Sequence, residues 1–216
     1  MSNELWRKSA LDLAEGIASK KFSSREVVDA HLARIDAVNP KINALVAVLA
    51  EEARAGADAA DKALAQRGPI GPLHGVPYTV KINIDVAGQA TTQGITALAE
   101  AIPAIDAPTI ERMKASGAIM LGRTNMPDLG LRVHTDSTLY GRTKNPWKSD
   151  RTAGGSAVAT AQRWQAECLH LVWATTSVVR CVTLLIAMAL LRSCQPRVWC
   201  PMHRCFRWKI SVSVRK

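Results

Sequence analysis

The chain has 216 residues, an apolar content of 48% and a formal net charge of +10. This length fits one domain or one and a half, and the apolar content allows a sizeable core. No secretory signal is visible, because the N-terminus lacks an apolar segment of the required length.

The positive charge is concentrated in the last part of the chain. Residues 1–156 carry 19 Lys and Arg residues against 17 Asp and Glu residues, whereas residues 157–216 carry 9 against 1. All five cysteines and four of the six tryptophans also lie in the second segment. This distribution argues against a general nucleic-acid-binding or membrane-binding surface. The cysteine-free first segment fits a cytoplasmic protein.

Two helices are predicted at the start of the chain. Apolar residues recur at helical spacing over 2–18 and again over 25–38. Ser23 or Ser24 is expected to cap the second helix, because Glu26 lies three residues after Ser23, as a capping box requires.

Two further residues belong to this second predicted helix. Pro40 is expected to close it. His31 lies on its apolar stripe, so we expect a packed core residue rather than a ligand.

The following elements alternate between strands and helices. They are a strand over 42–49, a surface helix over 51–66 that ends at Gly68, a loop over 69–77, a strand over 78–86, a helix over 106–117 and a strand over 118–121. The last three form a βα unit, so the sequence predicts an α/β fold with a mixed β-sheet flanked by helices.

Lys81 stands at an unusual place, in an apolar strand segment within residues 71–88, GPLHGVPYTVKINIDVAG. One interpretation is a side chain that reaches solvent from a strand terminus. The other is a buried lysine, whose pKa is lowered by loss of hydration so that it can act as a base.

Residues 151–156, RTAGGS, form a second candidate motif. Two glycines before Ser156 let the backbone approach closely and place a hydroxyl where side-chain bulk would not fit. The same composition is common in linkers, so this motif depends on what precedes it.

Five ordered segments together resemble the amidase-signature hydrolases. They are residues 71–88, 91–94, 122–127, 140–147 and 151–156. That family includes glutamyl-tRNA amidotransferase A subunits, fatty-acid amide hydrolases and bacterial amidases. Ile82 departs from the family pattern, in which many members carry aspartate, and we do not expect this to remove catalysis.

The resemblance implies hydrolysis of a carboxamide by a Ser–cis-Ser–Lys triad. Lys81 is then the base, and Ser156 is the bridging serine, held by an unusual cis peptide. The resemblance implies no cofactor and no metal, and a small-molecule amide as partner rather than a nucleic acid or a membrane. It leaves open a homodimer, which full-length relatives can form, and the choice between a free amidase and an amidotransferase subunit.

The nucleophile of the triad belongs to a later segment, G-x-D-I-G-G-S-x-R-x-P, whose backbone amides also form the oxyanion hole. Residues 172–185 stand in its place and read VWATTSVVRCVTLL. As written, the chain holds two of the three catalytic residues, and we expect it to be inactive.

The tail is consistent with the same gene read one base out of register. Residues 157–161 can be coded by GCG GTG GCG ACG GCA, and regrouping one base to the left allows Ser-Gly-Gly-Asp-Gly, as the signature continues. Over 172–185 the same regrouping allows G-L-G-N-D-I-G-G-S-L-R-N-P-A. Trp173 has only the codon TGG, so its last base and the first two of Ala174 must give glycine. The protein sequence does not fix the third base of most codons, so some agreement with the signature is expected by chance. The evidence for a shifted frame is the length of the ordered run and the glycines that the codons force.

Residues 157–216 are therefore expected to be an out-of-frame tail, with low order after about Ala161, and residues 1–156 to be the N-terminal part of an amidase-signature domain. A membrane helix over 171–191 is disfavoured by Arg180 at its centre. The cysteines and histidine over 194–205 match no standard zinc spacing. The alternative function is a non-catalytic protein whose basic tail binds a membrane or nucleic acid.

Overall fold

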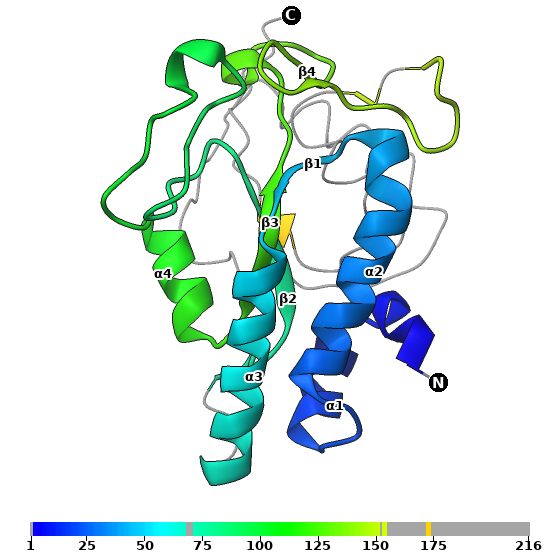
Figure 1. Ribbon diagram of the computed structural model, residues 1–216, viewed down its shortest axis with the longest axis vertical. Helices are drawn as coiled ribbons and strands as arrows, with labels where there is room; N and C mark the ends of the chain where they lie inside the picture. Colours follow the sequence, from blue (N-terminus) through cyan, green and yellow to red (C-terminus); the bar gives the residue numbers. More distant parts are fainter. Residues whose placement is uncertain (1, 68–70, 152, 155–171, 174–216) are drawn as a thin grey trace, which may run out of the picture. The chain divides into compact units, whose positions relative to one another are not determined.

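The computed structural model describes residues 2–67, 71–151, 153–154 and 172–173 (Figure 1). The chain divides into two compact units, Met1–Thr176 and Ser177–Lys216, and every described residue belongs to the first. The expected low order of the tail therefore falls outside the described residues, except that Val172–Trp173 form a short strand.

The described residues form helices and strands in alternation. The α-helices are α1 (Ala10–Ala18), α2 (Ser24–Ile42), α3 (Ala50–Arg67) and α4 (Pro108–Ala115), and the 3₁₀ helices are η1 (Ser2–Arg7), η2 (Thr96–Leu98) and η3 (Asp128–Gly130). The strands are β1 (Leu45–Val48), β2 (Pro77–Lys81), β3 (Ile119–Thr124), β4 (Asp136–Ser137), β5 (Gly141–Arg142) and β6 (Val172–Trp173).

Four strands form a mixed sheet in the order β1-β3-β2-β6. β1 runs antiparallel to β3, whereas β3, β2 and β6 are mutually parallel. β4 and β5 pair separately as an antiparallel ribbon. The predicted α/β class with a mixed sheet flanked by helices is therefore confirmed.

Helices cover the two faces of this sheet (Figure 1). One core lies between the sheet and α2 and α3, and it contains Val28, Leu32, Ile35, Leu45, Ala53, Ala57, Ala60, Ile119 and Leu121. The other lies on the α4 side and contains Tyr78, Val80, Ile84, Val86, Ile110 and Met113. The predicted surface helix α3 thus buries one face, where small alanines let it pack closely on β3.

The N-terminal segment is divided, although the sequence predicted one helix over 2–18. η1 ends at Arg7 and α1 begins after Ser9. The Ser9 hydroxyl accepts a hydrogen bond from the Asp12 N–H at 3.1 Å, and the Asp12 carboxylate accepts one from the Ser9 N–H at 3.2 Å. This reciprocal capping box starts a new helix at that point.

The second predicted helix begins as expected and ends later. Ser23 caps α2 through a capping box with Glu26, which confirms that part of the prediction. Pro40 does not close the helix, which continues to Ile42. A proline in the last turn removes only one backbone bond, and the left-handed Asn43 (φ 52°), whose N–H donates to Asn39 O at 2.8 Å, ends the helix instead.

His31 is a core residue, as predicted. Its exposed fraction is 0%, and its Nδ1 lies 2.7 Å from Val27 O within α2.

Candidate active site

Lys81 is the last residue of β2 and has no exposed surface. All five residues of this strand are buried. A fully buried lysine is rare, because an ammonium loses its hydration there. The interpretation as a side chain that reaches solvent is therefore wrong, and the burial expected of a base is confirmed.

The chain turns directly after Lys81, so the strand predicted over 78–86 ends early. Ile84 donates its N–H to Lys81 O at 3.1 Å, which closes a tight turn. The Arg123 guanidinium donates to Ile84 O at 2.8 Å and to Lys81 O at 3.5 Å. Burial lowers the pKa of Arg123, which is 2% exposed.

A β-bulge in β3 places Arg123 where it can reach this turn. β2 pairs Tyr78 with Met120 but Thr79 with Gly122, so one residue of β3 is extra. Gly122 is required there, because a Cβ would stand 2.3 Å from Ala47 O of β1. After the bulge, Arg123 pairs with Val80.

Lys81 pairs with Thr124 of β3 in the sheet register. Alternation along a strand places these two residues, together with Thr79, on one face of the sheet. Thr79 and Thr124 are fully buried, and neither hydroxyl has a hydrogen-bond partner within the described part of the chain. A polar strip therefore runs along this face to the carboxyl ends of parallel strands, where sites of α/β proteins form.

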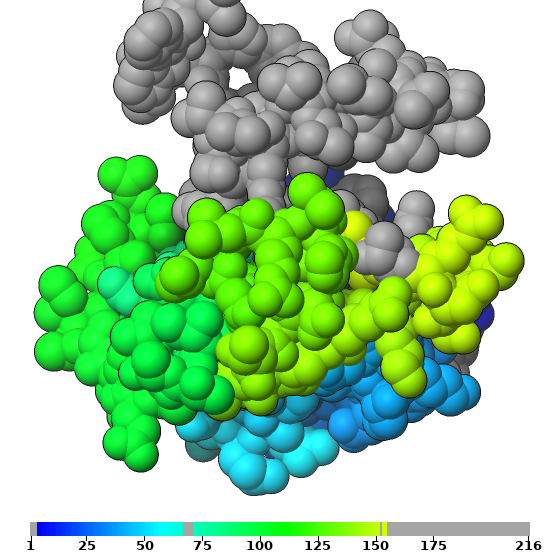
Figure 2. Space-filling model, turned by 90° about the horizontal axis from the view of Figure 1, so that it is seen from above, coloured from blue at the N-terminus to red at the C-terminus, as the bar shows by residue number. Residues whose placement is uncertain are grey.

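Loops that follow β2 and β3 gather over this end of the sheet (Figure 1), and they cover much of the face that is seen from above in Figure 2. Gly94 lies at the centre of one contact: its carbonyl accepts hydrogen bonds from Ser137 Oγ at 2.7 Å, from Thr138 Oγ1 at 3.3 Å and from Leu139 N at 3.2 Å. The segment 91–94 is thus joined to the loop that precedes β5.

Asn125 joins two further motif segments. Its Nδ2 donates to Gly141 O and to Thr143 Oγ1, both at 3.0 Å, and its Oδ1 accepts from the Met126 N–H at 2.9 Å. The Asn125 side chain is fully buried. It thereby fixes residues 140–147 against the end of β3.

Thr135 binds the backbone of the second candidate motif, residues 151–156. Gly154 O accepts a hydrogen bond from the Thr135 N–H at 2.8 Å and from Thr135 Oγ1 at 3.2 Å. Thr135 O in turn accepts from the Thr143 N–H at 3.0 Å. Gly154 has φ +87°, a conformation in which L side chains are strained.

Ser156 itself lies outside the described residues, as does the peptide before it. The described peptide bonds are all trans, and the cis geometry implied for Ser156 stays a prediction. The same holds for the approach of the Lys81 amine to the Gly154–Ser156 loop. The structure links Gly154 to the end of β3 through hydrogen bonds of Thr135, Thr143 and Asn125.

Sequence reasoning missed Arg123, Asn125 and Thr135. Arg123 and Asn125 lie inside a motif segment, but no sequence pattern predicts that their side chains bind backbone carbonyls. Thr135 lies outside every motif segment, and threonine is too common to signal such a role.

Two negative findings concern only the ranges that the structure describes. They contain no group of three or more His, Cys, Asp or Glu side chains that could hold a metal ion. They also contain no helix long and apolar enough to cross a membrane. The segments 171–191 and 194–205, considered above as a membrane helix and a metal site, lie almost entirely outside those ranges.

Comparison with known proteins finds the same family along most of the described chain. The family model described as Amidase matches residues 26–161. An indoleacetamide hydrolase of Bradyrhizobium diazoefficiens is 46% identical, over 71% of this chain and 29% of the relative. Glutamyl-tRNA(Gln) amidotransferase A subunits are similar too, and that of a Synechococcus species is 38% identical, over 71% of this chain and 32% of the relative.

Solved structures agree with this assignment. A bacterial aryl acylamidase of the amidase-signature family superposes with a TM-score of 0.71 and 34% identity, covering 75% of this chain and 34% of that structure. The chain thus spans about a third of the length of the relatives it matches. The five motif segments, the mixed sheet and these matches together show that the chain belongs to the amidase family, whose members hydrolyse carbon–nitrogen bonds of amides.

Proposed function

We propose that residues 1–156 are the N-terminal part of a domain that hydrolyses a small-molecule carboxamide, with Lys81 as base and Ser156 as bridging serine. The full burial of Lys81, at the end of the sheet where the motif segments converge, is the observation that carries this proposal. A lysine deprived of hydration favours the neutral amine, which is the form that can accept a proton.

The proposed reaction begins with two proton transfers. The neutral Lys81 amine accepts the proton of Ser156 Oγ, and Ser156 Oγ accepts the proton of a nucleophilic serine. The nucleophile forms a bond to the carbonyl carbon of the amide, whose oxygen becomes an anion held by backbone amides. The carbon–nitrogen bond then breaks, the amine leaves with the relayed proton, and water hydrolyses the acyl-enzyme. No cofactor or metal is required by these steps.

We propose further that the 216-residue chain is inactive. The segment that would supply the nucleophile and the oxyanion donors is replaced by residues 172–185. The family match ends at residue 161, and the chain spans about a third of the length of the relatives it matches. Loss of a triad nucleophile alone costs on the order of a millionfold in turnover.

The proposed cause is a shift of reading frame after codon 156. Sequencing the coding DNA across this codon tests it directly: one missing or extra base relative to an open frame that encodes the nucleophile segment is expected. An uninterrupted frame that gives no such segment in either neighbouring register would contradict the proposal.

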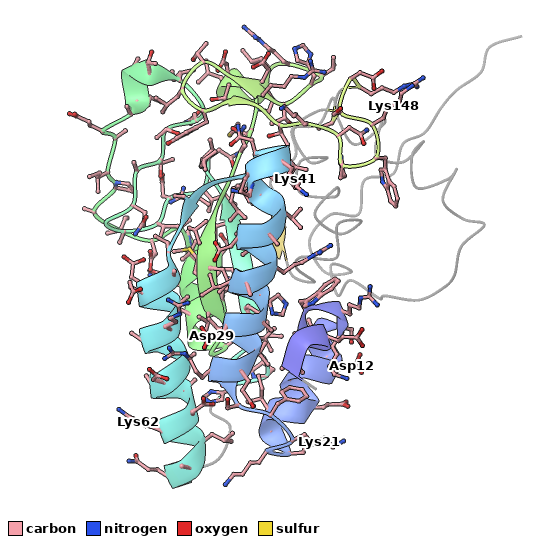
Figure 3. The ribbon with its side chains drawn as sticks, turned by 45° about the vertical axis from the view of Figure 1, so that its right-hand side comes forward. Asp12, Lys21, Asp29, Lys41, Lys62 and Lys148 are labelled. Atoms are coloured by element: carbon pink, nitrogen blue, oxygen red, sulfur yellow. The ribbon has the colours of Figure 1, made fainter. Side chains whose placement is uncertain are left out.

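Activity is tested by restoring the frame in a gene extended to its natural end. We expect hydrolysis of a simple aryl amide to appear, and to fall by at least a thousandfold in Lys81→Ala and in Ser156→Ala. Lys62→Ala is the matched control, because Lys62 lies exposed on α3 and extends away from the sheet (Figure 3). Turnover by the 216-residue chain that disappears in Ser156→Ala would contradict the assignment, because Ser156 would then be the nucleophile.

A cytoplasmic location belongs to this proposal, because residues 1–156 contain no cysteine. The excess of positive charge in residues 157–216 favours the second candidate function, binding of the tail to DNA or anionic vesicles. That candidate predicts an affinity that falls steeply with salt, measured with the 216-residue chain and with a chain ending at Ser156.

A further inference from the structure

We infer that Thr135 is the positioning residue of the Gly154–Ser156 loop, called here the Ser156 loop. Its side-chain hydroxyl holds the Gly154 carbonyl and so fixes the loop relative to Lys81. This inference rests on the proposed pairing of Lys81 with Ser156. It assigns Thr135 no contact with substrate.

The contact is a double one on a single acceptor. The Thr135 N–H and hydroxyl reach the Gly154 carbonyl at 2.8 Å and 3.2 Å. Thr135 is 1% exposed, and Ala153, next to Gly154, is also 1% exposed. Water therefore does not replace these donors, and the carbonyl two residues before Ser156 is held in one place.

Thr135 is itself tied to the strand beside Lys81. Its carbonyl accepts the Thr143 N–H at 3.0 Å, and Thr143 Oγ1 accepts from Asn125 at 3.0 Å. Asn125 directly follows Thr124, the register partner of Lys81. A continuous set of hydrogen bonds thus leads from the end of β3 to Gly154.

Such a connection matters because proton transfer between two side chains needs a heavy-atom distance of about 2.6–3.2 Å. Gly154 has φ +87°. Glycine can adopt many other backbone conformations as readily, so a contact is needed to hold the loop in this one. The Thr135 N–H remains in every variant, so only the hydroxyl can be removed. Thr135→Val removes it with little change of shape, and Thr135→Ser keeps it.

The first measurement tests the contact itself in the 216-residue chain. Arg151 is exposed, so the rate of trypsin cleavage after it reports opening of the adjacent Ser156 loop. We expect Thr135→Val to accelerate this cleavage about fivefold, the usual effect of losing one hydrogen bond on a local opening equilibrium. Thr135→Ser should restore the rate, and cleavage after the exposed Lys21 is the internal reference.

Thr138→Val is the matched control for this measurement. Thr138 Oγ1 also donates to a backbone carbonyl, that of Gly94, but not to the Ser156 loop. Its substitution should leave the cleavage after Arg151 unchanged. Equal rates in Thr135→Val and the parent chain would overturn the inference.

The second measurement tests positioning against Lys81. The Ser156→Cys variant places a thiol at this position, and a thiol close to the Lys81 amine forms thiolate more readily. Its alkylation by iodoacetamide near neutral pH should therefore be about fivefold faster than in the double variant that also carries Lys81→Ala. Mass spectrometry of the peptide resolves this thiol from the five cysteines of the tail. Adding Thr135→Val should abolish the enhancement, and adding Thr135→Ser or Thr138→Val should keep it.

The outcomes separate the two proposals. An enhancement that depends on Lys81 but survives Thr135→Val would overturn the positioning role and leave the proposed pairing intact. A rate unaffected by Lys81→Ala would overturn the pairing, and with it the positioning role, whereas the cleavage after Arg151 would still decide whether Thr135 holds Gly154.

Discussion

The two halves of the described structure are held together by different forces. The helical half, formed by α1, α2 and α3, buries apolar side chains in two clusters, one of them against the sheet, and adds ion pairs between α2 and α3. The loops after β2 and β3 bury few large apolar side chains, and Ser, Thr and Asn side chains bind their backbone carbonyls instead. Contacts of the first kind tolerate small shifts, whereas those of the second kind fix individual atoms.

The junction between the halves is the bulge at Gly122, and its disturbance should have the largest effect. Gly122→Ala places a Cβ 2.3 Å from Ala47 O, so the strands must separate. We expect a loss of about 3 kcal/mol in the free energy of unfolding, measured by urea titration.

Gly56→Ala is the matched substitution in the helical half. A Cβ there meets only Ile119 Cγ2, at 3.7 Å. Because alanine favours a helix over glycine, a gain of about 0.5–1 kcal/mol is expected. Similar losses at both positions would show that the bulge is not a point of close approach.

Asn125→Ala should have the next largest effect, confined to the loop half. It removes two buried hydrogen bonds, those to the Met126 N–H and to Thr143 Oγ1, so we expect a loss of about 2 kcal/mol. Trypsin cleavage after the exposed Arg142 should accelerate, while the helical circular dichroism signal is retained. A loss of helical signal at the same denaturant concentration as loop opening would mean that the two halves are one cooperative unit.

Asp29→Asn should have the smallest effect, in the helical half. Asp29 accepts hydrogen bonds from Arg25 Nε at 2.8 Å and Arg54 Nε at 2.9 Å, and Figure 3 shows it on α2. Burial alone would raise the pKa of Asp29, but these bonds outweigh it, so its pKa lies below the ordinary value. Because the side chain is 41% exposed, solvent screening limits the expected loss to about 0.5 kcal/mol.

The pH dependence follows from the lowered pKa. The ion pairs stabilise the fold fully above the unfolded-state pKa of about 3.9, and their contribution is lost as pH falls through the lower folded-state pKa. The difference between Asp29→Asn and the parent chain should therefore vanish near pH 2. Asp36→Asn, at an exposed position of the same helix, is the control. A difference that persists in acid would point to a packing effect.

The helical half could be predicted from the sequence more fully than the site. Ser23 and Glu26 are three residues apart, so their capping box is a local pattern that can be predicted from the sequence. Pro40 gave a wrong end for α2, because the helix ends at the Asn43 cap, which depends on a left-handed backbone conformation that no sequence pattern predicts. The bulge at Gly122 is set by β1, which lies more than seventy residues earlier, and no local pattern reports it.

The site was predicted as far as its motifs extend. Lys81 was identified because a charged residue within an apolar strand is conspicuous, and its burial is confirmed. Thr135 and Asn125 were missed because their partners are backbone carbonyls, which every residue carries. The position of Ser156 relative to Lys81 stays a prediction that the alkylation experiment tests.

Asn43 has a consequence for the order in which the chain folds during synthesis. Its Nδ2 donates to Tyr140 O at 2.8 Å, and its carbonyl accepts from Thr143 Oγ1 at 2.7 Å, across sequence separations of 97 and 100 residues. Contacts so distant in sequence form late, because a long loop must close first. The helical half can assemble on a ribosome-bound chain before residue 140 emerges, and the end of α2 then acts as a docking point to which the motif loops attach last.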